Sequence, residues 1–443
     1  MKANLISRRM RASLRVAAAA VIALCALPAG ANDVLKWNDI AVRAAATGGQ
    51  NPIQQTRTVA MAQAAVHDAL NAIRPRYAAY YYEGPAASGS NPAAAIAAAS
   101  RRVLVDVIPA FGSPQQRTDA LALVEDAYRT VLTAVPDGQP KQDGVGAGQA
   151  AGEAMLALRK DDGATRGAPY TPVNAPGRWR PTPNPDPPNP LIKDPKLAPG
   201  MAASTLPGWG NVTPFTLLSA SQYWLPGPPA LTSAKYASDF NEVKTLGGQV
   251  SPARTPEQTE IARFWFEGPG AWYRAARAAV EARKLDEWAS ARALALASLA
   301  MADSYIAGFK IRYVYDFWRP VTAIREAAED GNDATAADPQ WNSLQNTPSV
   351  SDYPSTQSLF SGAAAAALAA ALGTDQVSFT MTSGPPFADI KRSYTSLSQA
   401  ARESADSRVY AGIHFRSACD DGLALGQKIG LRAARSYLQP LGS

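Results

Sequence analysis

Residues 352–372 read DYPSTQSLFSGAAAAALAAAL and predict a helix that begins at a short polar turn. Alanine has the highest helix propensity, so the alanine block favours helix over strand. Pro354 and Ser355 stand just before it, and serine is a preferred N-cap residue. The first N–H groups of a helix have no partner inside the helix, so we expect these amides and the Ser355 hydroxyl to face outward and cradle an anion.

The rest of the chain has the same helical character. TRTVAMAQAAVHDALNAI (56–73) places apolar residues at helical spacing, residues 287–318 form a long apolar segment that ends at Arg319-Pro320, and a last helix is expected at roughly 413–437. No run with strand-like alternation stands out. With 443 residues, 47% of them hydrophobic, the sequence predicts an all-α protein built from two four-helix-bundle-like halves.

The first 31 residues are typical of an export signal. Five basic residues precede an apolar run from Val16 to Leu27, and the segment contains no acidic residue. Ala29-Gly30-Ala31 then offers small residues for cleavage. The run is short for a bilayer, so we expect no membrane span after its removal and a periplasmic or secreted protein. Whether export uses the general or the twin-arginine route stays open.

We expect three parts after the signal (1–31): an N-terminal helical domain (32–162), a proline-rich strap (163–230) and a C-terminal helical domain (231–443). Proline excludes helices and central strands from the strap. The strap also contains bulky aromatic residues, which predict an ordered segment packed on the helices. These residues are Trp179, Trp209 and Phe215.

Charge and cysteine content exclude some functions. The net charge of +6 falls to +1 once the signal is removed, so nothing indicates nucleic-acid binding. Cys25 lies in the signal and Cys419 is then the only cysteine, which excludes an intramolecular disulfide. We expect Cys419 to be a buried apolar side chain and His67 to be structural.

Cationic groups gather near the expected helix ends of the C-terminal half. Arg312 and Arg319 are seven residues apart, which on one helix places both guanidiniums over the same spot. Arg408 precedes His414 by six residues, and Gly412 between them predicts a bend before the last helix. Guanidiniums bind oxyanions and an imidazole adds a lone pair, so the pattern predicts a tetrahedral oxyanion site.

The three site segments, FWRPVTAIRE (317–326), DYPSTQS (352–358) and SRVYAGIHF (407–415), resemble the vanadium-dependent haloperoxidase family and its relatives, the type 2 phosphatidic acid phosphatases and bacterial acid phosphatases. GRWRPTP (177–183) and RTPEQTEIARFW (254–265) resemble the bacterial haloperoxidases as well. The likeness extends over nearly the whole chain after the signal.

The resemblance implies a site for vanadate, which phosphate also occupies in the related phosphatases. His414 would be the sole protein ligand of vanadium, or the nucleophile that forms a phosphohistidine. The residues that match the family's anion-binding positions are Arg312, Arg319, Ser355, Thr356 and Arg408.

Three of these positions depart from the family. Lysine is usual where Arg312 stands, glycine where Thr356 stands, and an acid–base histidine where Gln357 stands. Glutamine forms hydrogen bonds but exchanges no proton near neutral pH. The loss of a general acid–base group typically costs about 10²–10⁴ in rate, so catalysis at Gln357 is expected to be impaired.

Three functions stay open on the sequence. The first is a haloperoxidase that uses hydrogen peroxide, halide and a small organic substrate. The second is a phosphatase that cleaves a phosphomonoester through His414. The third is a non-catalytic or cofactor-free protein that binds an oxyanion. The halide, the organic substrate and the oligomeric state are not determined by the sequence.

Overall fold

The computed structural model describes residues 32–182 and 205–442, all of which belong to one compact unit. The expected signal peptide (1–31), with Cys25, and the strap from 183 to 204 lie outside the described residues. The roles predicted for these segments stay predictions. The domain boundaries at 162 and 230 also stay predictions.

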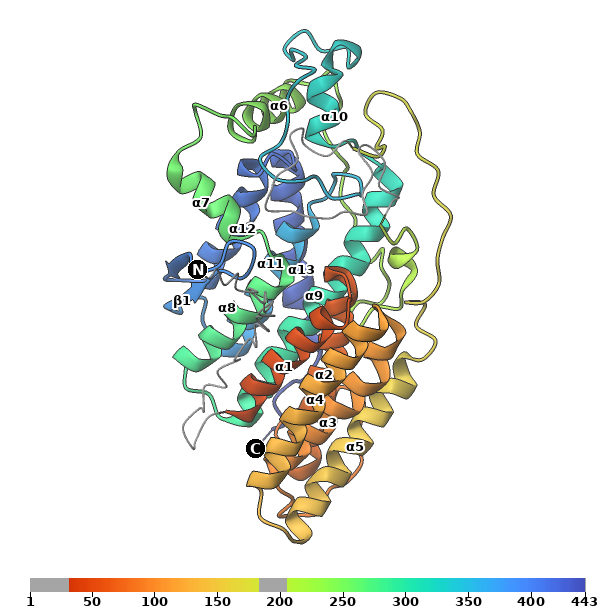
Figure 1. Ribbon diagram of the computed structural model, residues 1–443, viewed down its shortest axis with the longest axis vertical. Helices are drawn as coiled ribbons and strands as arrows, with labels where there is room; N and C mark the ends of the chain where they lie inside the picture. Colours follow the sequence, from red (N-terminus) through yellow and green to blue (C-terminus); the bar gives the residue numbers. More distant parts are fainter. Residues whose placement is uncertain (1–31, 183–204, 443) are drawn as a thin grey trace, which may run out of the picture. The chain divides into compact units, whose positions relative to one another are not determined.

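The all-α fold class is confirmed: the described chain consists mainly of helices, with one two-stranded sheet (Figure 1). In chain order the elements are α1 (Asp33–Thr47), α2 (Pro52–Ile73), α3 (Pro92–Val107), η1 (Ile108–Ala110), α4 (Pro114–Ala134), α5 (Gln139–Arg159), η2 (Trp209–Asn211), α6 (Ala234–Leu246), α7 (Pro256–Phe264), α8 (Pro269–Ala282), α9 (Glu287–Tyr315), α10 (Pro320–Arg325), η3 (Ala327–Glu329), α11 (Thr356–Leu372), β1 (Phe379–Thr382), β2 (Lys391–Tyr394), α12 (Leu397–Tyr410) and α13 (Arg416–Ser436).

The helices form two groups that share a common core. Helices α2, α3 and α5 pack against one another, with α1 and α4 beside them, while α9, α11 and α13 pack together and α12 covers α11 (Figure 1). Helix α2 also packs on α9, which joins the groups. Of the described helices, only α9 is long and apolar enough to cross a membrane, but 94% of its most apolar window is buried, as in a core helix.

Helices α11 and α13 approach so closely that only glycine fits between them. Gly422, Gly426 and Gly430 recur every four residues on the face of α13 that meets α11. A Cβ atom added at Gly426 would lie 1.9 Å from the main-chain oxygen of Leu359. This close packing places the N-terminus of α11 beside the first turn of α13, because the main-chain oxygen of Ala418 accepts a hydrogen bond from Ser355 N–H.

The described parts of the strap, residues 163–182 and 205–230, contain aromatic side chains packed on the helices, as predicted for these residues. Trp179, Trp209 and Phe215 are buried. The buried carboxylate of Asp303 on α9 accepts hydrogen bonds from three successive strap N–H groups, those of residues 215–217. These bonds satisfy the charge of Asp303 in the core and attach the strap to the central helix.

Two expectations about local structure were wrong. The long helix α9 ends at Tyr315 and not at residue 318, because Asp316 adopts a left-handed conformation with φ of 51°. The chain also contains an antiparallel hairpin of β1 and β2, in which Phe379 lies opposite Tyr394. Each strand has only four residues, too few for alternation to stand out in the sequence.

Candidate oxyanion-binding site

Arg312 and Arg319 meet in the same buried place, although they do not share one helix as expected. Arg312 lies in the last turn of α9, whereas Arg319 is the N-cap residue of α10 after an extended segment. Both side chains are about 1% exposed. The two arginine side chains therefore converge as predicted. The turn at Asp316 brings them together, and not a spacing of two turns along one helix.

The two guanidiniums donate to main-chain oxygens of the loop before α11. Arg312 Nη2 lies 2.6 Å from the oxygen of Pro354, and Arg319 Nε lies 2.7 Å from that of Val350. Arg319 Nη1 also donates to the oxygen of Ile413 at 2.6 Å. Lys310, which is two residues from the family's lysine position, instead donates to Asn211 of the strap.

Ser355 is the N-cap residue of α11, as predicted, but it does not face solvent. Its hydroxyl accepts a hydrogen bond from the N–H of Ser358 and another, at 2.9 Å, from the Ser358 hydroxyl. The residue is fully buried. The N-terminus of α11 therefore opens into the protein interior, where its partial positive charge is poorly screened.

The methyl group of Thr356, at a position where the resemblance implies glycine, packs toward α9. This Cγ2 methyl lies over Gly308 of α9, where it would come within 3.0 Å of an added Cβ atom. Since Gly308 has no side chain, it provides the space for the methyl group. The extra volume at residue 356 is thus accommodated by α9.

Gln357 and Arg408 donate to the same acceptor, the main-chain oxygen of Trp265 at the end of α7. The distances are 2.8 Å from Gln357 Nε2 and 3.1 Å from Arg408 Nη2. Arg408 also donates to the hydroxyl of Ser407. The structure therefore places the glutamine and the third arginine on one wall of the site.

His414 lies in the turn between α12 and α13, next to Arg319. The turn depends on Gly412, whose φ is 77° and where an added Cβ would lie 2.1 Å from the oxygen of Gly247, so the predicted bend is confirmed. The ring of His414 contacts Arg319 Nη1 through Nε2 at 2.9 Å and lies 2.8 Å from Asp352 Oδ1 through Nδ1.

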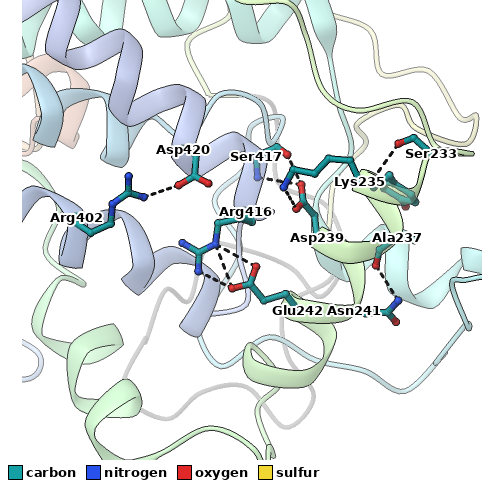
Figure 2. A network of polar contacts seen from close by, with 11 residues as sticks. Ser233, Lys235, Ala237, Asp239, Asn241, Glu242, Arg402, Arg416, Ser417 and Asp420 are labelled. Atoms are coloured by element: carbon teal, nitrogen blue, oxygen red, sulfur yellow. Dashed lines mark hydrogen bonds and ion pairs between the residues drawn. The ribbon is translucent and has the colours of Figure 1, made fainter.

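Ionic contacts with α6 hold the start of α13, and with it the turn that carries His414 (Figure 2). Asp239 accepts a 3.1 Å hydrogen bond from the N–H of Ser417, and so caps a helix whose own N-cap residue makes no side-chain bond. Glu242 pairs with Arg416 at 2.7 Å. Both acidic residues belong to α6, so two helices determine the position of the histidine.

Burial sets the protonation of the site. It lowers the pKa of Arg312 and Arg408 to about 10, and it lowers that of Arg319, yet all three stay charged at neutral pH. Burial, followed by the charges of the arginines, lowers the pKa of His414 well below 6.5, so its ring is neutral and retains a lone pair. Burial raises the pKa of Asp352, against the opposing effect of Arg319 and Arg312.

The residues fit a tetrahedral oxyanion such as vanadate or phosphate. Arg312 and Arg319 lie near the carboxyl group of Asp352, whereas Arg408 has no ion pair with a carboxylate among the described residues, which leaves excess positive charge in a low-dielectric interior. The Nε atom of Arg312 is buried without a hydrogen-bond partner in the described chain. An anion would compensate this charge, and Nε2 of His414 would be its one nitrogen ligand.

Two contributors to the site were missed by the sequence reasoning. The first is Asp352, to which the sequence pattern gives no role. Asp316 and Asp406 lie beside motif residues in the sequence, where either could orient a site arginine. Asp406 instead pairs with Arg416, and Asp316 contacts Arg178 at 3.3 Å. The second contributor is the main-chain oxygen of Trp265, for which no side-chain signal exists.

His67 and Cys419, for which the sequence predicts structural roles, both lie in the protein core. His67 is buried in α2, with its Nδ1 3.0 Å from Asp68 Oδ1, away from the arginines of the site. Cys419 is fully buried in α13, and burial raises the pKa of its thiol to about 12. Both observations agree with the structural roles expected for them.

Comparisons with known proteins agree with this fold. The family model of the VCPO second helical-bundle domain matches residues 292–442. Vanadium chloroperoxidase of Curvularia inaequalis is 26% identical over 400 residues, which cover 75% of this chain and 64% of the length of that protein. The chain thus spans less than two thirds of this relative.

Solved structures share the fold. The first bacterial vanadium-dependent iodoperoxidase superposes with a TM-score of 0.76 at 24% identity, over 93% of this chain and 97% of that chain. An apo-type bacterial vanadium-dependent chloroperoxidase superposes with a TM-score of 0.69 at 18% identity, over 87% of this chain and 94% of the other. The residues matched by the family model contain every predicted site residue, and the fold shared with the solved structures extends over nearly the whole chain.

Proposed function

We propose that this chain is an exported haloperoxidase that binds vanadate, uses hydrogen peroxide to oxidise halide, and halogenates a small organic substrate. The observation that carries the proposal is the set of three buried arginines around a neutral histidine. When bound, vanadate supplies a Lewis-acidic centre at which hydrogen peroxide becomes able to oxidise halide.

The protein groups in this proposal bind and orient the anion. Arg312, Arg319 and Arg408 neutralise its charge, and their burial strengthens each interaction relative to water. The hydroxyl of Ser355 and the first N–H groups of α11 donate hydrogen bonds to its oxygens. His414 provides the nitrogen lone pair.

Gln357 is the residue at which this site lacks a group for acid–base catalysis. Its side-chain amide donates to the main-chain oxygen of Trp265 and to the hydroxyl of Ser404, and it takes up no proton at neutral pH. We therefore propose slow turnover, with anion binding intact.

The test is vanadate titration of the purified protein followed by a halogenation assay. We expect bound vanadium, and bromination or iodination of monochlorodimedone that requires both vanadate and hydrogen peroxide. His414→Ala should lose the vanadium, whereas His67→Gln, which changes the other histidine of the chain, should retain it. Absence of vanadate binding in the folded wild-type protein would exclude the proposal.

A phosphatase is the second candidate, because the same arginines suit phosphate and the Nε2 lone pair of His414 suits attack on phosphorus. Without a general acid at residue 357, such an enzyme would favour acidic leaving groups. Hydrolysis of p-nitrophenyl phosphate that vanadate inhibits and His414→Ala abolishes would support it. Hydrolysis that survives this substitution would refute it.

Gln357 also motivates the third candidate, a protein that binds an oxyanion without catalysis. Calorimetry would then show phosphate or vanadate binding, while both assays show no turnover. Turnover in either assay would contradict this reading.

A further inference from the structure

The two ring nitrogens of His414 have different neighbours. Nε2 lies 2.9 Å from Nη1 of Arg319, and Nδ1 lies 2.8 Å from Oδ1 of Asp352. All three side chains are at least nine-tenths buried, so water does not compete for these contacts.

The chemistry of Arg319 assigns the tautomer of His414. A guanidinium is a hydrogen-bond donor only, so Nε2 must be the acceptor in this contact and must carry no proton. A neutral imidazole has one N–H, and the proton therefore lies on Nδ1. This side of the ring faces residue 352, whose carboxylate and main-chain oxygens are the acceptors beside it.

Asp352 has a position that suits this role. Its main chain is fixed on both sides, since its N–H donates to Phe317 at 2.8 Å and its oxygen accepts from Arg312 at 3.4 Å. Its carboxylate lies 3.8 Å from Arg319. The contact with His414 is close but does not have the geometry of an aligned hydrogen bond; the main chain of residue 352 also lies beside the imidazole, and the main-chain N–H of Phe415 lies beside the carboxylate. A contact between two buried polar groups lowers the cost of burying both of them.

We propose that Asp352 is a positioning residue that holds His414 in the Nδ1–H tautomer and so keeps Nε2 unprotonated, with a lone pair that a bound oxyanion would take over from Arg319. The proposal rests on the proposed anion site and adds to it the residue that makes the imidazole competent as a ligand. A carboxylate behind a ligating histidine has this effect in metal sites, where its removal typically costs about 10–100-fold in affinity.

Charge and positioning lead to opposite expectations for Asp352→Ala. If Asp352 acted only through its charge, its removal would add net positive charge and tighten the binding of every oxyanion. If it positions His414, vanadate, which needs the Nε2 lone pair, should bind about 10–100-fold more weakly. Inorganic phosphate, bound through the arginines, should bind at least as tightly as before.

The direct readout is the ¹⁵N spectrum of the imidazole rings, measured without any anion on ¹⁵N-histidine-labelled protein that has no added histidine tag. The chain has only two histidines, so His67 serves as an internal control. We expect a protonated Nδ1 and an unprotonated Nε2 for His414 in the wild-type protein. Asp352→Ala should produce a tautomer mixture, and Asp352→Asn, which keeps an oxygen acceptor, should restore the wild-type form at least in part.

Two results would overturn the proposal. One is a wild-type His414 that carries its proton on Nε2, a measurement that needs no variant to fold. The other is an unchanged Nδ1–H tautomer in Asp352→Ala, because the main-chain oxygen of residue 352 would then hold the ring. Neither readout depends on turnover or on vanadate, so failure of the proposed enzyme activity is distinguishable from failure of this inference.

Discussion

The side-chain amide of Gln357 donates a 2.8 Å hydrogen bond to the main-chain oxygen of Trp265. The same oxygen accepts from Arg408, so residue 357 lies at the anion-binding wall. A histidine at this position would add a proton donor and acceptor beside the bound anion.

We predict that Gln357→His raises the rate of halide oxidation by about 10²-fold, at the lower end of what general acid–base catalysis contributes. The rate is measured with monochlorodimedone at saturating vanadate and hydrogen peroxide, together with vanadate affinity. Gln357→Asn is the matched control and should show no gain, because it also lacks a titratable group. An equal gain in both variants would show that space, and not proton transfer, limits turnover.

Arg408 should contribute to anion affinity through its charge. Removing one charged hydrogen-bond partner costs about 1.5–3 kcal/mol, so Arg408→Met should weaken phosphate binding by about 10–150-fold in calorimetry. Arg402→Met is the control on the same helix, because Arg402 is half exposed and pairs with Asp420 (Figure 2). It should leave phosphate affinity unchanged, and a similar loss in both variants would argue against a local role for Arg408.

Thr356 and Gly308 should be energetically coupled. A Cβ atom at residue 308 would lie 3.0 Å from Thr356 Cγ2, so we expect Gly308→Ala to destabilise the protein by about 1–2 kcal/mol through overpacking. In a Thr356→Ser background, which lacks that methyl, the same change should cost less or even stabilise by up to about 1 kcal/mol through helix propensity. Urea unfolding of the four proteins measures the coupling, and additive effects would contradict the contact.

The contact between α11 and α13 should not tolerate a methyl group. Gly426→Ala would place Cβ 1.9 Å from a main-chain oxygen, so we expect a loss of at least about 3 kcal/mol or failure to fold. Gly146→Ala in α5 is the control, since nothing lies within 4 Å of its added Cβ. It should stabilise the protein by up to about 1 kcal/mol. Thermal melting of both variants decides the comparison.

Cys419 should be unreactive in the folded protein. Burial raises the pKa of its thiol to about 12, so the reactive thiolate is absent at pH 7–9 and forms only as the pH approaches that value. Iodoacetamide should therefore modify the protein in denaturant but not in buffer at pH 8, as measured by mass spectrometry. Rapid modification of the native protein would show that α13 opens.

The sequence by itself determined the features that depend on neighbouring residues. Alanine content predicts α11, Ser355 is its N-cap residue, and Thr255 with Pro256, both of types preferred at a helix start, begins α7. The bend at Gly412 is likewise local, since it depends on the positive φ of one residue. The resemblance of the site segments to a known family indicated which side chains form the candidate site.

Only the tertiary structure decided which groups meet. Arg312 and Arg319 converge through a turn and not along one helix, and His414 lies between Arg319 and Asp352, which are 95 and 62 residues away in the chain. Gln357 and Arg408 share a main-chain oxygen of Trp265, which every residue type possesses and no pattern marks. Such contacts depend on how the helices pack and on which groups lose access to water, and periodicity along one segment does not carry that information.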